Sequence, residues 1–139
     1  MASDRYLVDS SIWIRLFRKR LNPPLAARVD AVLAERRAAT NGFIRLEIVS
    51  GAGTEKEYRE SLDNLSALTQ LEITDSTWTR AARLGYDLRR KGLPNQSSDL
   101  LIAASAIEHD AVLMHADADF DRIAEHSDLK VESYAALAD

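Results

Sequence analysis

Cysteine is absent from the 139 residues of this chain. Disulfide frameworks, thiolate zinc sites and cysteine nucleophiles are therefore excluded, and a reducing compartment such as the cytoplasm is expected. No apolar run approaches the roughly 20 residues that a membrane-spanning helix needs, and the first residues lead into a strand-like segment rather than a signal peptide. The chain also lacks repeats, linkers and low-complexity segments, so we expect one domain covering residues 1–139.

Charge is abundant but unevenly spread. Hydrophobic residues make up 46% of the chain and charged residues 29%, the balance of a soluble globular protein. The net charge is −4, yet residues 1–46 carry nine Lys and Arg against four acids, and residues 108–139 carry two against nine. A basic flank beside an acidic cluster keeps nucleic acid open as a partner, particularly if the acids hold metal ions.

Short apolar segments alternate with helical patterns along the chain. Strands are predicted at 5–8, within 38–42, and at 70–73, 111–114 and 130–132. Helices are predicted at 12–20, 24–37, 43–50, 55–68, 76–91, 99–109 and 120–125, with Ser10 or Ser11, Thr54, Asp75 or Ser76, and Ser97 or Ser98 as N-caps. The alternation indicates an α/β sandwich with a mainly parallel sheet. Trp78, at the start of the long helix, is expected to be packed.

Acidic residues fall where such a sheet would bind a ligand. Asp9 follows the first strand, and Asp117 follows the strand at 111–114 across a short turn. Because ligands bind at the carboxyl ends of strands in open parallel sheets, both acids are expected at one site. Asp99 opens an apolar helix, Glu47 lies in the helix at 43–50, and Asp119 comes two residues after Asp117. Clustered carboxylates repel one another unless a cation neutralises them, and oxygen ligands suit Mg²⁺ or Mn²⁺.

Each acid also fits a purely structural role. Asp9 fits an N-cap, and Asp99 fits a first-turn residue favoured by the helix dipole. Glu47 fits the solvated face of an amphipathic helix, and Asp117 and Asp119 fit turn and cap positions. Taken singly, these roles are the commoner ones. The combination of the acids is what points to a metal site.

Two basic runs lie near these acids in the sequence. The first is Arg15, Arg18, Lys19 and Arg20, and the second is Arg89, Arg90 and Lys91. Either run could follow an RNA backbone. Basic residues at helix C-termini also complement the helix dipole without any ligand, so both interpretations stay open.

Four segments carry a resemblance to a known family. They are LVDSSIWI at 7–14, RLEIVSG at 45–51, SDLLIAASA at 98–106 and HADADFD at 115–121. They resemble, in order and spacing, the signature blocks of PIN-domain ribonucleases, and more narrowly those of the VapC toxins of bacterial type II toxin–antitoxin modules. The overall length is also similar, so the resemblance covers essentially the whole chain.

The resemblance implies a three-layer α/β/α sandwich with a short, mainly parallel sheet. It implies an acidic pocket in which one or two Mg²⁺ or Mn²⁺ ions are held by the catalytic residues Asp9, Glu47, Asp99 and Asp117, with Asp119 as a further metal ligand. Ser11 falls where the family has a small polar residue that supports the pocket. His115 stands where many relatives have Thr or Ser, which leaves its role open.

The resemblance also implies an activity and partners. The activity would be metal-dependent hydrolysis of phosphodiester bonds in transfer, ribosomal or messenger RNA, which inhibits translation. A metal lowers the pKa of its bound water, and a carboxylate can accept the water's proton. The implied partners are a VapB-type antitoxin and a second copy of the chain, in a homodimer and a tetramer or larger assembly with antitoxin. Trp13 and Phe17 lie on one helix face and could serve the core, the dimer or the antitoxin.

Three other functions compete with this one. A nuclease for structured DNA is compatible with the same acids. Phosphotransfer through an aspartyl phosphate at Asp9 would need a second acid two residues later, where the chain has Ser11. A degenerate PIN-like domain would act only as an RNA- or protein-binding module, although all the acids of the blocks are present.

Overall fold

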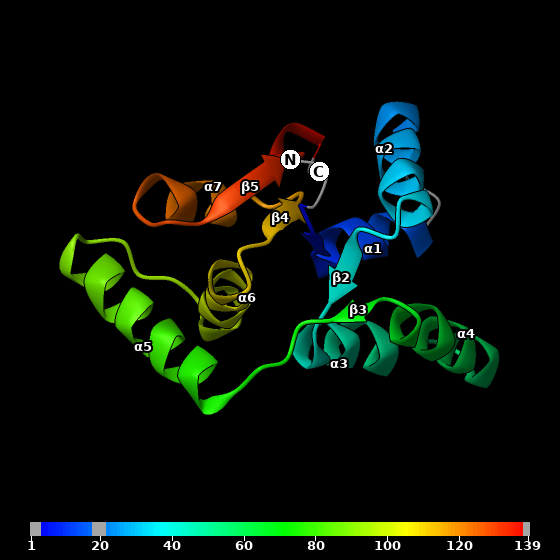
Figure 1. Cartoon of the computed structure of the whole chain (residues 1–139), viewed down its shortest axis with the longest axis horizontal. Coiled ribbons are helices and arrows are strands. Elements are labelled where there is room, and N and C mark those ends of the chain that lie inside the picture. Colours follow the sequence, from blue (N-terminus) through cyan, green and yellow to red (C-terminus); the bar gives the residue numbers. More distant parts are fainter. Residues whose placement is uncertain (1–3, 18–21, 138–139) are drawn as a thin grey trace.

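A five-stranded sheet forms the centre of the computed structural model, which describes residues 4–17 and 22–137 (Figure 1). The strands are β1 (Tyr6–Val8), β2 (Ala38–Thr40), β3 (Thr69–Gln70), β4 (Val112–His115) and β5 (Lys130–Ser133). The helices are α1 (Ser10–Phe17), α2 (Pro23–Ala34), α3 (Gly42–Ser50), α4 (Glu55–Ser66), α5 (Asp75–Arg90), α6 (Ser97–Glu108), α7 (Ala118–Glu125) and the short 3₁₀ helix η1 (Ala135–Leu137). None of the helices in this described part is long and apolar enough to cross a membrane.

The strand order is β3-β2-β1-β4-β5, and every pair is parallel. Leu7 of β1 lies opposite Ala39 of β2 on one side and Leu113 of β4 on the other. The strand that follows β1 in the chain, β2, lies on one side of it, whereas the strand that follows β4, β5, lies on the opposite side of the sheet's centre. The direction in which successive strands are added therefore reverses between the two central strands, β1 and β4. Right-handed crossovers then place helices on both faces of the sheet, and Figure 1 shows α2 on the opposite side of the strands from α5 and α6. The predicted α/β architecture is confirmed, and the crevice at the reversal is where such sheets bind ligands.

The core explains why these segments form the centre. Leu7 and Val8 of β1 are fully buried, which fits a strand covered on both faces. In α6, six consecutive residues from Leu101 to Ala106 are buried, as its apolar sequence predicted. The body of α6 is thereby packed in the core, and its first-turn residue Asp99 lies near Asp9 and Asp117, which follow β1 and β4.

Several local predictions differ from the structure. β3 pairs with β2 only at Thr69–Gln70, because beyond the Leu71 amide, which donates to the Thr40 carbonyl at 2.8 Å, the chain turns into α5. The N-cap of α5 is Thr74, which forms a reciprocal capping box with Thr77, rather than Asp75 or Ser76. The N-cap of α6 is Gln96 without a side-chain cap, rather than Ser97 or Ser98. Trp78 is 57% exposed rather than packed. The end of the first predicted helix, at 18–20, lies outside the described residues.

Asn41 fixes the helix that carries Glu47. Its side chain is fully buried; Oδ1 accepts from the Ile44 amide at 2.9 Å, and Nδ2 donates to Ser105 Oγ at 3.2 Å. We expect Asn41→Ala to lower the free energy of unfolding by about 2–3 kcal/mol, since it removes the N-cap and leaves a buried hydroxyl without this partner. Urea denaturation measures the loss.

Thr54→Ala is the matched control for this prediction. Thr54 caps α4 in the same way, accepting from the Glu57 amide at 3.1 Å, but in an exposed setting. Its loss should cost only about 1 kcal/mol. Equal losses for the two variants would show that the buried contact with Ser105 adds nothing to the cap.

Candidate metal centre

Three carboxylates meet at the carboxyl edge of the sheet. Single oxygen atoms of Asp99, Asp117 and Asp119 all lie within 4.8 Å of one another, and all three side chains are partly buried. They come from two helix N-termini that are far apart in the sequence, α6 and α7. All three residues were predicted from the sequence, and the structure brings them together.

Backbone hydrogen bonds within the segment 115–121 position its acidic side chains. Asp117 is the N-cap of α7, and its Oδ1 accepts from the Asp119 amide at 2.9 Å. The Asp117 amide in turn donates to Nδ1 of His115 at 3.1 Å. A helix N-terminus favours a nearby negative charge by about 0.3–1 kcal/mol. This local frame therefore holds two carboxylates side by side despite their repulsion.

The third carboxylate is the one most disturbed by its surroundings. Burial raises the pKa of Asp99 to about 6, and the charges of Asp117, Asp119, Asp9 and Glu47 add to the rise. The dipole of α6 favours the charge but does not offset these effects. The cluster is thus electrostatically unfavourable on its own, which is the condition that a bound cation relieves.

Asp9 lies at the end of β1 and is only 4% exposed. Burial raises its pKa, and hydrogen bonds from Ser11 act against the rise. Asp9 Oδ2 accepts from Ser11 Oγ at 2.6 Å and from the Ser11 amide at 3.0 Å. Ser11 Oγ also accepts from the Ala116 amide at 3.0 Å. The serine therefore ties the end of β1 to the segment that follows β4 and fixes one oxygen of Asp9.

Glu47 reaches the same edge from α3. Its Oε1 accepts from Ser10 Oγ at 2.8 Å. Burial raises the pKa of Glu47, and the charge of Asp9 adds to it. Glu47 and Asp9 are thus electrostatic neighbours of the cluster, but the close group of three oxygen atoms does not include them. Their predicted role as metal ligands stays a prediction.

Behind the cluster lies a buried histidine whose partners the sequence did not reveal. His115 is fully buried, and its Nε2 lies 3.2 Å from Asp121 Oδ1. Asp121 Oδ2 accepts from Ser133 Oγ of β5 at 2.8 Å. Burial lowers the pKa of His115, and its Nδ1 accepts a backbone proton, so the ring is neutral with its hydrogen on Nε2. Nothing in the local sequence signals a contact between α7 and β5.

Among the residues that the structure describes, one cation, Arg122, contacts the cluster. Arg122 Nη2 donates to Asp119 Oδ1 and to Asn95 Oδ1, both at 3.2 Å. The i,i+3 spacing of Asp119 and Arg122 on α7 is the one signal that could have predicted the ion pair. The contact with Asn95 joins the loop before α6 to α7, across 27 positions of sequence.

The predicted RNA-binding residues lie apart from the cluster. Arg15 is partly buried on α1, and Arg89 and Arg90 are exposed at the end of α5. Arg18 and Lys19 lie outside the described residues. Among the described contacts, none joins Arg15, Arg89 or Arg90 to a carboxylate of the cluster.

The chemistry of the donors suits a hard divalent cation. The close group consists of carboxylate oxygens alone, the ligands of Mg²⁺ and Mn²⁺ rather than of zinc or copper. Among the described residues, Arg122 pairs with Asp119 alone of the three, and the pKa of Asp99 is still raised. These observations make the carboxyl edge of β1 and β4 the candidate metal centre.

Comparisons with known proteins place this arrangement in a family. Residues 6–126 match the PIN domain. Ribonuclease VapC11 of Mycobacterium tuberculosis is 36% identical over 132 residues, which cover 92% of this chain and 98% of the relative. Ribonuclease VapC51 of the same organism is 37% identical over 122 residues, covering 86% of this chain and 85% of the relative.

Solved structures agree on the fold. The toxin–antitoxin complex VapBC2 from Rickettsia felis, bound to a promoter DNA fragment, contains a chain with a TM-score of 0.77 and 23% identity, covering 93% of this chain and 98% of that one. VapBC-1 from nontypeable Haemophilus influenzae gives a TM-score of 0.71 at 23% identity, covering 94% and 98%. Together with the sequence matches, they show that this chain belongs to the PIN domain family and, within it, to the VapC group.

Proposed function

We propose that this chain, acting as a single domain, is an endoribonuclease dependent on Mg²⁺ or Mn²⁺. We also propose that it serves as the toxin of a toxin–antitoxin pair, cutting RNA and thereby inhibiting translation. The observation that carries the proposal is the meeting of Asp99, Asp117 and Asp119 at the carboxyl edge of the sheet. Relatives named VapC ribonucleases, matched over most of this chain, support it.

The residues of the site divide the work of hydrolysis. Asp99, Asp117 and Asp119 would hold the cation, and Asp9 and Glu47 would complete its surroundings, directly or through water. A bound divalent cation supplies an activated water and neutralises charge on the scissile phosphate.

The remaining contacts orient these carboxylates. Ser10 donates to one oxygen of Glu47 and Ser11 to one oxygen of Asp9, which restricts the orientation of both carboxylates. His115 holds the backbone at Asp117. Preorganised charges of this kind need little rearrangement when the phosphate arrives.

Incubation of total cellular RNA with the purified protein, freed of any partner, tests the function directly. Discrete fragments are expected with Mg²⁺ or Mn²⁺ and none with EDTA. The same incubation with RNA from the native host detects an enzyme that cuts only one particular RNA, which RNA from another organism would lack. Intact RNA under every condition, from a protein shown to be folded, would favour a domain that only binds.

We propose a VapB-type antitoxin as the protein partner, as in the VapBC complexes among the structural neighbours. A groove of about 500 Å³ lies between α1, α3 and α4 and suits a peptide segment. Its apolar side includes Ile14 and Phe17, which are 39% and 48% exposed. Glu47 of the candidate metal centre lines the same groove. A segment bound there would lie directly beside the metal site.

Phe17→Ser is expected to weaken antitoxin binding at least tenfold while leaving RNA cleavage unchanged. Phe17 stacks on Trp13 with 6.2 Å between ring centroids, and Trp13 is itself buried in the core. The outer ring is therefore free to anchor a partner, and exposed aromatic anchors carry much of the binding energy of such interfaces. Calorimetric titration with the cognate antitoxin measures the change.

Trp78→Ser is the matched control, since Trp78 is an equally exposed aromatic residue on α5. It should bind the antitoxin as the wild type does. If both variants lost affinity alike, the groove between α1, α3 and α4 would not be the docking site.

A further inference from the structure

A second groove lies along α5, on the other side of the sheet from α2. It encloses about 1080 Å³ between α5 and the turn from α7 to β5. One wall is formed by Ser76, Thr79, Arg80, Arg83, Leu84, Asp87, Arg90 and Lys91, and Ile107, His126, Ser127 and Asp128 complete the lining. Neither the metal centre nor the antitoxin groove uses this surface.

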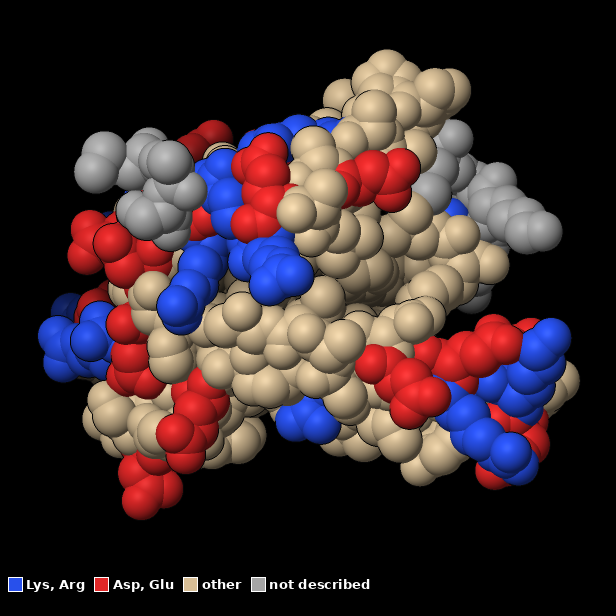
Figure 2. Space-filling view, turned by 45° about the vertical axis from the view of Figure 1, so that its right-hand side comes forward, with Lys and Arg blue, Asp and Glu red and all other residues tan. Residues whose placement is uncertain are grey.

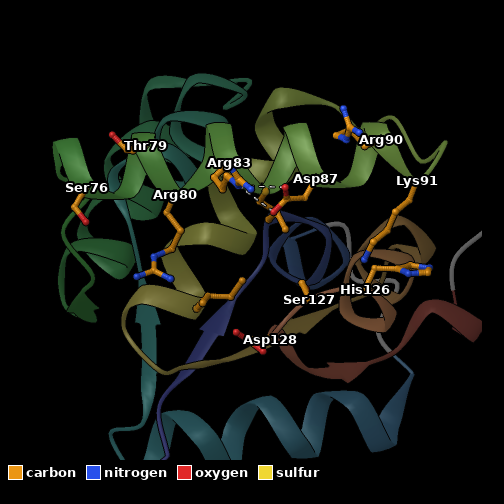
Figure 3. Close-up of a pocket in the computed structure, with 12 residues that line it drawn as sticks. Ser76, Thr79, Arg80, Arg83, Asp87, Arg90, Lys91, His126, Ser127 and Asp128 are labelled. Atoms are coloured by element: carbon orange, nitrogen blue, oxygen red, sulfur yellow. Dashed lines mark hydrogen bonds and ion pairs between the residues drawn. The ribbon is translucent and has the colours of Figure 1, made fainter.

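The α5 wall carries a row of cations. The lining holds four cations, Arg80, Arg83, Arg90 and Lys91, and two acids, Asp87 of α5 itself and Asp128 of the opposite wall. In Figure 3, Arg80 and Lys91 extend from the two ends of α5 toward the opposite wall, whereas Arg90 points away from it. From Arg80 to Lys91 the helix advances by about 16 Å. That length accommodates several consecutive phosphates of one nucleic acid strand.

Most of these cations are only loosely held. Arg80 Nε lies 3.8 Å from Glu108, and Arg83 Nε lies 3.2 Å from Asp87 on an exposed helix face. An exposed pair such as Arg83–Asp87 is worth about 0–1 kcal/mol and exchanges readily for another anion, and the 3.8 Å separation makes the Arg80–Glu108 contact a loose one. Lys91 has no acidic partner among the described residues.

The groove is physically connected to the candidate metal centre. α7 carries Asp119 of the cluster in its first turn and ends at His126, which lines the groove. The two residues are separated by about 10 Å along the helix axis. The loop after Lys91 also returns to the site, where Asn95 contacts Arg122. A polyanion lying in the groove can therefore reach the carboxylates within a few nucleotides.

We infer that the α5 groove binds the RNA backbone next to the bond that is cut. This inference rests on the proposed nuclease function. It adds a positively charged surface for RNA, which the metal centre does not provide. A net charge of −4 and a cluster of carboxylates repel RNA. The groove gives the substrate a sequence-independent positive track, so it sets the affinity for RNA while the carboxylates carry the reaction.

The test compares two pairs of substitutions that remove the same charge. R80Q/K91Q acts on the groove, and K56Q/R59Q acts on α4, whose mixed acidic and basic side chains occupy the lower right of Figure 2. Lys56 and Arg59 are 83% and 71% exposed, and each has an acidic i,i+4 partner, as Arg83 has in the groove. Binding of a fluorescent 20-nucleotide single-stranded RNA of mixed sequence is followed by anisotropy in EDTA, where the RNA stays intact.

R80Q/K91Q should bind this RNA at least tenfold more weakly than the wild type, and the α4 pair less than threefold. The slope of log Kd against log salt should fall by about 1.4 for two lost phosphate contacts on a single strand. R80K/K91R keeps both charges and should bind as the wild type does. Thermal melting confirms that each variant is folded.

The outcomes separate this inference from the proposed function. Equal weakening by the two pairs, or no weakening, overturns the α5 groove as the RNA site even if the wild type cleaves RNA. A groove pair that binds RNA normally but loses the antitoxin assigns the groove to a protein instead. A wild type that neither binds nor cleaves RNA overturns the proposed function itself.

Discussion

Asp99→Asn is expected to lower RNA cleavage by about a thousandfold, with little change in RNA binding. Asp99 shares the close oxygen group with Asp117 and Asp119 and lies in the first turn of α6, whose following residues are buried. An amide keeps the size of the side chain but is a neutral, weaker ligand for a hard cation. Removing one preorganised electrostatic contact to the reacting group lowers the catalytic rate by about 10²–10³-fold. Single-turnover cleavage with Mn²⁺ measures the loss.

Asp63→Asn is the control for this loss. Asp63 is an exposed acid on α4, remote from the carboxyl edge of the sheet. Its replacement removes the same charge and should leave the rate within about twofold, because isolated surface changes act weakly. Full activity in the Asp99 variant would show that Asp99 is not a required metal ligand, with Asp117, Asp119, Asp9 and Glu47 as the remaining candidates.

The central strands and the buried helix were predictable because their signals are local. Tyr6–Val8 is a short, wholly buried apolar run, and the apolar sequence of α6 allows no exposed face. Where two signals compete within a few residues, the sequence does not decide. Thr74, Asp75 and Ser76 are all good cap residues, and only the backbone at the end of β3 selects Thr74. An aromatic residue near the start of a helix does not by itself show whether its side chain points to the core or to solvent, which is why the exposure of Trp78 was missed.

The candidate site also has some features that the local sequence predicts and others that it does not. Its acids lie in short contiguous motifs, so their identity and their common edge could be predicted from the sequence. The residues beside those acids are in turn held by groups from elsewhere in the chain. Ser133 reaches Asp121 from β5, and Asn95 reaches Arg122 from the loop before α6. Contacts of this kind depend on how the helices pack, which no spacing in the sequence encodes.

Asp99 is also expected to make the stability of the protein depend on pH. Burial and four neighbouring carboxylates raise its pKa to about 6, so its charge opposes folding at neutral pH. The rise of this pKa from 3.8 to about 6 corresponds to about 3 kcal/mol, which solvent near this partly exposed group reduces to about 1–2 kcal/mol. In EDTA at pH 7, Asp99→Asn should therefore be more stable than the wild type by that amount in urea denaturation.

The advantage of the variant should vanish as the pH falls. Below pH 6 the folded wild type takes up a proton at Asp99, whereas the unfolded chain takes it up only near pH 4. The wild type thus gains stability relative to the variant across this interval, and the two curves meet near pH 4. His115, whose pKa is lowered by burial, acts in the opposite direction. Because both proteins contain it, its contribution cancels in the difference between the curves.

Millimolar Mg²⁺ or Mn²⁺ should reverse the order of the two proteins at pH 7. A cation that binds only the folded state stabilises it by about 2.7 kcal/mol at one hundred times its Kd. The wild type gains this increment and the charge repulsion at Asp99 becomes an attraction, whereas Asp99→Asn gains little. If the variant stayed the more stable protein at saturating metal, Asp99 would be a strained carboxylate without a metal to hold. The reversal therefore distinguishes a metal centre from a cluster of acids, independently of any RNA.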